Sequence, residues 1–299
     1  MTRTPSPRRP VRKILFIRPP AHLWPILNES DNFLLPLAFP CIAAYLRQQR
    51  PDLEVKFIDC LPLKIGWTRL RELLAQERAD MVAVGESTVY MKEGMRALEL
   101  ARELDPEITT VVGGHFHSHL PAYTLDTYAC VDYVVMYEGE HAFLQLLEAL
   151  GDGGDLSRVK SLAYRDEQGR ARITEPAPLC DLDELPMPAY DLVPMERYSP
   201  FGLLWPKAIT IQGSRGCPYG CDFCSWTNLE GEHYLNEDGS VRLVPTRRQK
   251  SVERTLAEID LLYNKHGVRY LFWVDATWNF DSAWLEGVCD GIIQRGYKL

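Results

Sequence analysis

Short apolar runs alternate with helical patterns through the first half of the chain. The runs are apolar on both faces, as strands are when they lie inside a parallel sheet. They are Ile14–Ile17, Val55–Ile58, Met81–Val84, Thr110–Val112 and Tyr133–Met136. Apolar positions between Met95 and Leu104 follow a helical period. Five such units predict an α/β fold: a flavodoxin-like, doubly wound parallel sheet over residues 13–150.

A hairpin and a proline-rich stretch come next. Ser161–Tyr164 and Ala171–Thr174 flank a Gln168-Gly169 turn, which is typical of a β-hairpin. Residues 176–206 contain seven prolines, which favour extended structure. We therefore interpret residues 151–206 as a hairpin followed by an extended connector between two domains.

A second β/α series begins near Ala208. Its first strand, Ile209–Ile211, leads into a loop that contains three cysteines. The elements expected after that loop are a polar insertion over 228–246, a helix capped by Ser251 and ended by Gly267, a strand over Tyr270–Val274 and a helix from Trp284 to Ile292. These elements form a second, shorter alternation of strands and helices.

Composition narrows the function classes. The 299 residues include 46% hydrophobic and 25% charged residues, which is ordinary for a globular protein. A net charge of −8 argues against a general nucleic-acid binder. No run approaches the roughly 18 apolar residues of a membrane span. The basic tail over residues 1–12 is expected to be disordered, and Ile14–Ile17 is too short for a secretory signal, so we expect a cytoplasmic protein.

Three of the eight cysteines form a motif. Cys217, Cys221 and Cys224 have the spacing C-x3-C-x2-C, which brings three thiolates into one loop. Three protein ligands on a four-iron cluster would leave one iron open for chemistry. The other five are isolated and are interpreted as reduced core or surface residues: Cys41, Cys60, Cys130, Cys180 and Cys289.

A zinc site is the alternative for this loop. It would need a distant fourth ligand, for which His233 is the candidate. Structural zinc sites usually pair two cysteines with a second pair of ligands, and no second pair of cysteines is present.

The loop resembles the motif of the radical S-adenosylmethionine (SAM) superfamily, and the aromatic Phe223 directly before Cys224 matches that motif. The resemblance implies that the three cysteines hold a 4Fe-4S cluster whose fourth iron binds SAM. It also implies that an electron from the cluster cleaves SAM to methionine and a 5′-deoxyadenosyl radical.

The flavodoxin-like domain before this motif resembles the cobalamin-binding radical SAM class. The run beginning Gly113-Gly-His looks like a Gly-Gly-x-His loop of that class, and Glu138-Gly-Glu-His looks like its Gly-Glu loop. The implied cobalamin-binding residues are those of these two loops, together with a hydroxyl after the third strand: Gly113, Gly114, His115, Glu138, Gly139, Glu140 and Ser87.

Histidines raise two further questions. The D-x-H-x-x-G motif of histidine-ligated cobalamin is absent, and His22 is interpreted as a loop residue rather than a cobalt ligand. His115, His117 and His119 alternate as in an extended loop and could suggest a separate metal site. The cobalamin resemblance explains their position better.

Asp275 ends the second barrel strand, where the superfamily contacts the SAM amino group. A carboxylate can accept a hydrogen bond from an ammonium group. The alternative is a helix N-cap or a solvated aspartate. The nearby Trp273, Trp278 and Trp284 are interpreted as barrel packing rather than a substrate platform.

The resemblance implies about six barrel units, and residues 207–299 supply two. We therefore expect a truncated barrel whose C-terminal part is missing or lies on another polypeptide. With only two units, the strand edges of the barrel would lack pairing partners and would be exposed.

The sequence thus predicts a cobalamin-dependent radical SAM enzyme that methylates an unactivated carbon of a small-molecule or peptide substrate. A flavodoxin or ferredoxin would supply the electron. One alternative is an oxidative cyclase of the magnesium-protoporphyrin ester type, which Cys224-Ser-Trp resembles. Another is a cobalamin-binding fragment without turnover. A methylthiotransferase is disfavoured because the first domain lacks that family's cysteine triad.

Overall fold

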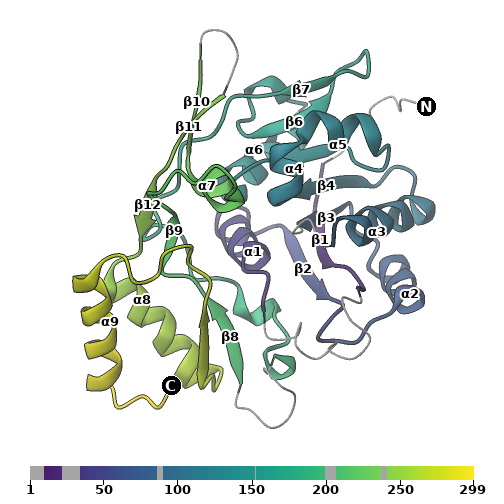
Figure 1. The fold of residues 1–299 in the computed structure, drawn as a ribbon. Coiled ribbons are helices and arrows are strands. Elements are labelled where there is room, and N and C mark those ends of the chain that lie inside the picture. The colour runs from purple at the N-terminus through teal and green to yellow at the C-terminus, as the bar shows by residue number, and fades with distance from the viewer. Residues whose placement is uncertain (1–9, 22–33, 86–89, 152, 199–206, 237–240) are drawn as a thin grey trace.

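The computed structural model describes residues 10–21, 34–85, 90–151, 153–198, 207–236 and 241–299. A seven-stranded sheet forms one part of the molecule, and a smaller β/α part lies beside it (Figure 1). His22 and Ser87 lie outside the described residues.

The large sheet has the strand order β2-β1-β3-β4-β5-β6-β7. Its first five strands are parallel, and the order 2-1-3-4-5 is that of a flavodoxin-like domain. They are β1 (Lys13–Arg18), β2 (Glu54–Asp59), β3 (Met81–Gly85), β4 (Thr109–Gly113) and β5 (Tyr133–Val135). All five apolar runs of the sequence are therefore strands, and the predicted fold of the first part is confirmed.

The predicted hairpin forms but joins this sheet. Strands β6 (Leu162–Arg165) and β7 (Ala171–Ile173) pair antiparallel with each other. β6 also pairs antiparallel with β5, so the hairpin extends the first sheet. The sequence alone assigns the hairpin to the connector. A local sequence pattern predicts a strand but does not identify the strand with which it pairs.

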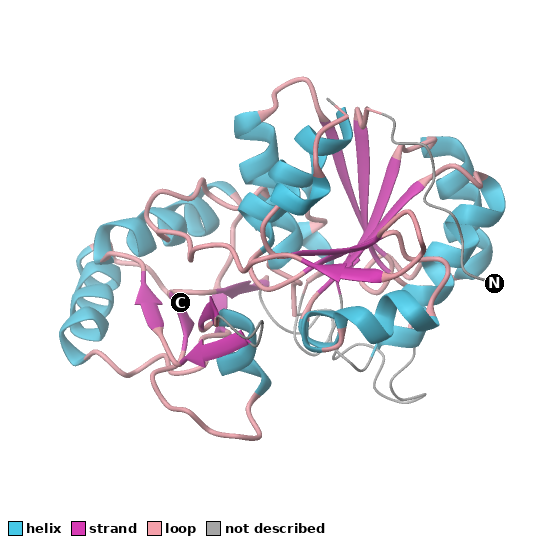
Figure 2. Cartoon of the chain, turned by 90° about the horizontal axis from the view of Figure 1, so that it is seen from above, coloured by secondary structure: helices cyan, strands magenta, loops and turns pink. Residues whose placement is uncertain are grey.

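Helices cover both faces of the sheet (Figure 2). On β1, Ile14 and Phe16 belong to one apolar cluster, and Leu15 and Ile17 belong to the other. The first cluster includes residues of α1 (Ala38–Gln49) and α6 (Gly139–Gly151), and the second includes residues of α2 (Trp67–Glu77), α3 (Met91–Leu104) and α5 (Pro121–Thr127). This alternation follows from the two-residue period of a strand.

The connector packs tightly against the first part. Short 3₁₀ helices at Tyr190–Leu192 and Met195–Arg197 interrupt it. Tyr190 and Tyr198 are fully buried, and the Tyr198 hydroxyl donates a hydrogen bond to Asp59, which also pairs with Arg18. The proline-rich stretch is therefore part of the core on its described residues.

The second part is built on one parallel strand pair. β8 (Ala208–Ile211) pairs with β13 (Tyr270–Trp273) through a crossover that contains α8 (Val252–Asp260). Ser251 caps α8 as predicted, because its side chain accepts a hydrogen bond from the Arg254 amide. The chain then forms a π-helical turn over Leu261–Lys265 and, after β13, helix α9 (Ser282–Gln294).

Smaller elements surround the cysteine loop. They are β9 (Ser214–Gly216), α7 (Ser225–Glu230), the antiparallel pair β10 (Glu232–Leu235) and β11 (Val241–Val244), and β12 (Arg247–Gln249), which pairs with β9. The polar insertion expected over 228–246 thus contains a β-ribbon.

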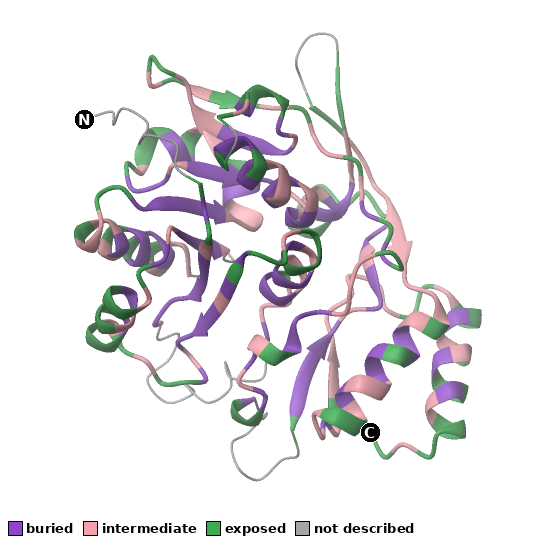
Figure 3. Ribbon diagram, turned by 180° about the vertical axis from the view of Figure 1, so that it is seen from behind, coloured by how far each residue is buried: buried purple, intermediate pink, exposed green. Residues whose placement is uncertain are grey.

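The apolar core continues from one part to the other. Ile209 and Ile211 of β8 lie in the same cluster as Phe39 of α1 and Phe143 of α6. The Leu35 amide donates a hydrogen bond to Thr210 Oγ1 across the same boundary at 2.8 Å. Figure 3 colours segments on both sides of this boundary as buried, in keeping with the shared apolar cluster.

Candidate functional site

The three cysteines occupy one loop with different exposures. Cys217 follows β9 and is buried, whereas Cys221 is exposed and Cys224 is half-buried. Cys224 is the residue before α7, where the backbone amides of Thr227 and Trp226 lower the pKa of its thiol. Amides at a helix start stabilise a thiolate in this way.

Thiolate donors are the chemistry that an iron–sulfur cluster needs, and this loop supplies three. Within the described residues, however, no three His, Cys, Asp or Glu side chains are gathered closely enough to hold a metal ion. His233, the fourth ligand of the zinc alternative, stacks on Tyr137 with ring centroids 3.8 Å apart. The loop thus offers the ligand type that a cluster needs without gathering the three thiols, and the cysteine assignment stays a prediction.

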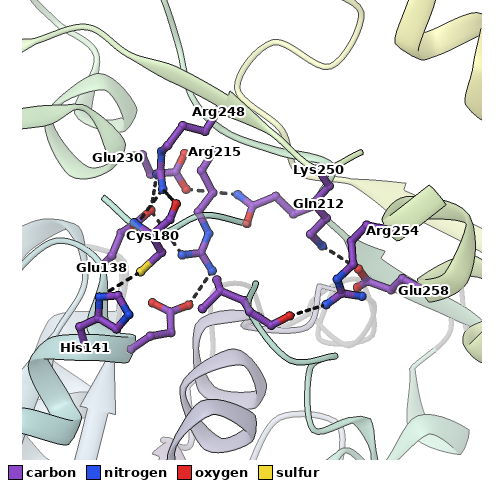
Figure 4. A network of polar contacts seen from close by, with 12 residues as sticks. Glu138, His141, Cys180, Gln212, Arg215, Glu230, Arg248, Lys250, Arg254 and Glu258 are labelled. Atoms are coloured by element: carbon purple, nitrogen blue, oxygen red, sulfur yellow. Dashed lines mark hydrogen bonds and ion pairs between the residues drawn. The ribbon is translucent and has the colours of Figure 1, made fainter. Parts of the chain in front are cut away.

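Glu138 and Glu140 pair with arginines of the second part. Arg215 on β9 lies 2.6 Å from Glu140 Oε1 and 3.3 Å from Glu138 Oε1. Arg248 on β12 also pairs with Glu138, as Figure 4 shows. These arginines hold the pKa of Glu138 at about 2, against the burial that would raise it. The carboxylates predicted to bind cobalamin thus join the two parts of the chain.

Cys180 extends this polar group. Its backbone amide donates to Glu138 Oε2, and its carbonyl accepts from Arg248. Its thiol lies 3.7 Å from His141 Nδ1 (Figure 4). Burial raises the pKa of the Cys180 thiol well above its usual value, so it is a structural rather than a nucleophilic cysteine.

Asp275 lies at the end of β13 and faces the start of the cysteine loop. Its carboxylate accepts hydrogen bonds from Ser214 Oγ at 2.6 Å and from the Gly213 amide at 3.2 Å. Burial raises its pKa. Asp281, not Asp275, caps α9, and Asp275 is half-buried with hydrogen-bond donors around its carboxylate. Contact with SAM stays a prediction.

The Gly-Gly-His run is not an extended loop. Gly114 has φ +89° after β4, and His115–His119 forms the short helix α4. The expectation of an extended loop was wrong. The positive φ of Gly114 turns the chain into a helix, and the alternate spacing of the histidines does not reveal that turn. His117 is buried against Thr124 Oγ1 at 3.0 Å, and burial lowers its pKa to about 4.

Side chains after the cysteine loop cover the carboxyl ends of β4 and β5. Trp226 of α7 packs edge-on against His115, with ring centroids 4.9 Å apart. His233 of β10 stacks on Tyr137, which follows β5 with φ +59°. The Nδ1 atom of His115 is buried without a hydrogen-bond partner among the described residues. An unpaired buried polar atom at this edge is suited to a bound group.

The other residues singled out in the sequence are Phe223, Gly139 and three tryptophans. Phe223 is 93% exposed on the cysteine loop. Gly139 begins α6, and a Cβ added there would approach Ile42 to 2.5 Å. The tryptophans are packed together, with ring centroids 5.2 to 6.5 Å apart, as expected for barrel packing: Trp273, Trp278 and Trp284.

Sequence reasoning missed Arg215, Arg248 and Glu230. Arg215 stands inside the Gly-Ser-Arg-Gly run directly before Cys217. A charged arginine within this short glycine-flanked run, directly before a cysteine motif, is the local feature that could have suggested its buried ion pairs. Glu230 lies in the polar insertion and Arg248 follows it on β12, and the partners of neither could be identified from spacing.

The fold and the site define a class: a flavodoxin-like domain followed by the beginning of a radical SAM barrel. Residues 23–147 match the model of the B12 binding domain. An uncharacterised methyltransferase of Pyrococcus horikoshii is 29% identical over 290 residues, covering 97% of this chain and 59% of that protein. An anaerobic magnesium-protoporphyrin IX monomethyl ester cyclase of Rubrivivax gelatinosus is 25% identical, covering 95% of this chain and 48% of that protein.

A solved structure agrees with the fold. The cobalamin-dependent SAM radical enzyme OxsB, with aqua-cobalamin and SAM bound, superposes with a TM-score of 0.74 at 20% identity. The match covers 95% of this chain and 37% of OxsB. The sequence resemblance to the cobalamin-binding radical SAM family is therefore confirmed. The chain spans about half the length of the curated relatives it matches.

No helix among the described residues is long and apolar enough to cross a membrane.

Proposed function

We propose that this chain is the cofactor-binding part of a cobalamin-dependent radical SAM enzyme that methylates an unactivated carbon. One observation carries the proposal. The segment after the cysteine loop packs on the carboxyl ends of β4 and β5, through the pairs Trp226–His115 and His233–Tyr137. Ligands of open α/β sheets bind at this edge. The thiol loop and the corrinoid edge therefore meet.

The chain's residues would have distinct roles. Cys217, Cys221 and Cys224 would ligate a 4Fe-4S cluster, with Cys224 favoured as thiolate by the start of α7. Gly113, Gly114 and His115 would line the corrinoid, and Asp275 would accept a hydrogen bond from SAM. When bound, the cluster supplies an electron for SAM cleavage and the corrinoid supplies a methyl group.

Further components belong to the proposal. The electron would come from a flavodoxin or ferredoxin. β13 pairs with β8 and with no other described strand, so additional β/α units are expected to complete the barrel around a small-molecule or peptide substrate. We expect the protein in the cytoplasm, where its cysteines stay reduced.

Binding and cleavage assays test this function. The chain is reconstituted anaerobically with iron, sulfide and hydroxocobalamin and then incubated with SAM and a reductant. We expect corrinoid absorbance to remain with the protein after gel filtration, and 5′-deoxyadenosine to form. Cys217→Ala should abolish SAM cleavage and keep the corrinoid. Loss of corrinoid from the wild-type chain would contradict the proposal, and bound corrinoid without 5′-deoxyadenosine would favour a non-catalytic fragment.

Oxidative ring formation is the second candidate. The sequence Cys224-Ser-Trp and the relative from Rubrivivax gelatinosus favour it. Mass spectrometry of products separates the two. A product heavier by one methylene supports methyl transfer, whereas an oxygenated ring supports the cyclase.

A further inference from the structure

The four residues directly before Cys217 are all held by carboxylates. Asp275 accepts from the Gly213 amide and the Ser214 hydroxyl. Glu138 and Glu140 pair with Arg215. The fourth residue, Gly216, donates its backbone amide to Glu230. We refer to Gly213–Gly216 as the loop base.

Glu230 differs from the other carboxylates because it comes from the far side of the cysteine loop. It is the last residue of α7, the helix that begins directly after Cys224. Its Oε2 atom lies 2.7 Å from the Gly216 amide nitrogen, and its Oε1 atom accepts from Gln212 Nε2 at 3.2 Å. Its side chain is buried, so water does not replace these bonds. One carboxylate thus ties the entrance of the loop to its exit.

Gly216 has no alternative position. Its φ of +82° lies in the left-handed region, and an added Cβ would stand 2.0 Å from the Thr246 carbonyl oxygen. The Thr246 carbonyl therefore occupies the space into which a side chain at position 216 would project. A buried amide needs an acceptor, and Glu230 provides it.

Helix α7, which carries Glu230, is also held in place. Trp226 lies one helical turn before Glu230 on α7 and packs on His115 of the first part. The Gly231 amide donates to the Thr227 carbonyl at 2.9 Å, and the extended backbone of Gly231 ends the helix at Glu230. α7 is therefore held against α4, and its last side chain points back to the loop base, as Figure 4 shows for Glu230 beside Gln212 and Arg215.

We propose that Glu230 is a positioning residue that closes the Cys217–Cys224 loop and holds its thiols for cluster binding. The cluster itself rests on the proposed function. The closing of the loop rests on the hydrogen bond between Glu230 and Gly216.

Three variants separate the parts of this idea. Glu230→Gln keeps an oxygen acceptor for the Gly216 amide. Glu230→Leu fills the space without an acceptor, and Glu230→Asp keeps the charge but is one methylene too short. Glu253, exposed on α8, supplies the matched control Glu253→Leu.

Hydrogen exchange of the cluster-free chain tests the closing directly. Loss of a buried hydrogen bond should speed exchange of amides 216–224 by roughly tenfold or more in Glu230→Leu and Glu230→Asp. Glu230→Gln and Glu253→Leu should exchange like wild type. Wild-type exchange in Glu230→Asp would overturn the proposal even if Glu230→Leu failed to fold, which circular dichroism reports.

Iron content and electron paramagnetic resonance test the link to the cluster. We expect Glu230→Leu and Glu230→Asp to lose iron or to change the spectrum of the reduced cluster, and Glu230→Gln to restore both. Wild-type spectra in every variant would overturn the positioning role. If the wild-type chain itself bound no iron, the proposed function would fail, while the exchange data would still decide whether Glu230 closes the loop.

Discussion

The β1–β5 sheet and the β8–β13 pair are both parallel, but they are covered differently. Strands of the first sheet are almost entirely buried between two layers of helices, as at Ile17. On β13 no residue is fully buried, and Tyr270 is exposed. The apolar residues of β8 join a core that begins in the first part. The first sheet carries its own core, whereas the second part depends on its contacts with the first.

This contrast explains where charge is buried. The Arg215 side chain is only 11% exposed and pairs with Glu138 and Glu140 at the junction of the two parts. Buried ion pairs add little net stability, but removing one partner leaves an uncompensated charge. We therefore expect separation of the two parts at this junction to be costly, because it would leave these charges unpaired.

Breaking this junction should have the largest effect. Arg215→Met leaves Glu140 without its arginine and Glu138 with Arg248 alone, so we expect the free energy of unfolding to fall by about 3–5 kcal/mol in urea titrations. The exposed pair Arg47–Asp191 is the control, and Arg47→Met should cost less than about 1 kcal/mol. Equal effects would show that the junction does not join the two parts.

Truncating one apolar residue in the β1–β5 sheet and one in the β8–β13 pair compares how deeply the two sheets are buried. Ile17→Ala removes a fully buried side chain of β1 and should cost about 2–5 kcal/mol. Leu271→Ala on the half-buried β13 should cost clearly less, roughly 1–2 kcal/mol, because less apolar surface is lost. If chemical denaturation gave Leu271→Ala the larger cost, the second region would have a complete core of its own.

Acid should weaken the first region through His117. The unfolded chain takes up a proton near pKa 6.5, but burial lowers the folded pKa to about 4. The contribution is therefore fully present above pH 6.5 and is lost as pH falls from 6.5 to 4, by at most about 3 kcal/mol. In His117→Gln the melting temperature should fall less between pH 6.5 and pH 4 than in wild type. In the control His119→Gln the fall should equal that of wild type. Parallel curves for His117→Gln and wild type would contradict this.

The sequence predicted those features that depend on local patterns. Five apolar runs became five parallel strands, and Ser251 capped its helix. The cysteine loop was placed between a strand and a helix. These features follow from periodicity and from the chemistry of a few residues, which neighbouring positions reveal.

Features that depend on distant partners were not visible. The hairpin at Leu162 joined β5, and Glu138 met Arg215 rather than an open site. The Gly114 turn converted the histidine run into a helix. In each case the deciding contact comes from a segment far along the chain or from a backbone angle.

The most direct test of the account is the metal content of the reconstituted chain. After anaerobic incubation with iron and sulfide, we expect about four irons per chain. The combined change of Cys217, Cys221 and Cys224 to alanine should remove them. One zinc per chain with no uptake of iron would contradict the account.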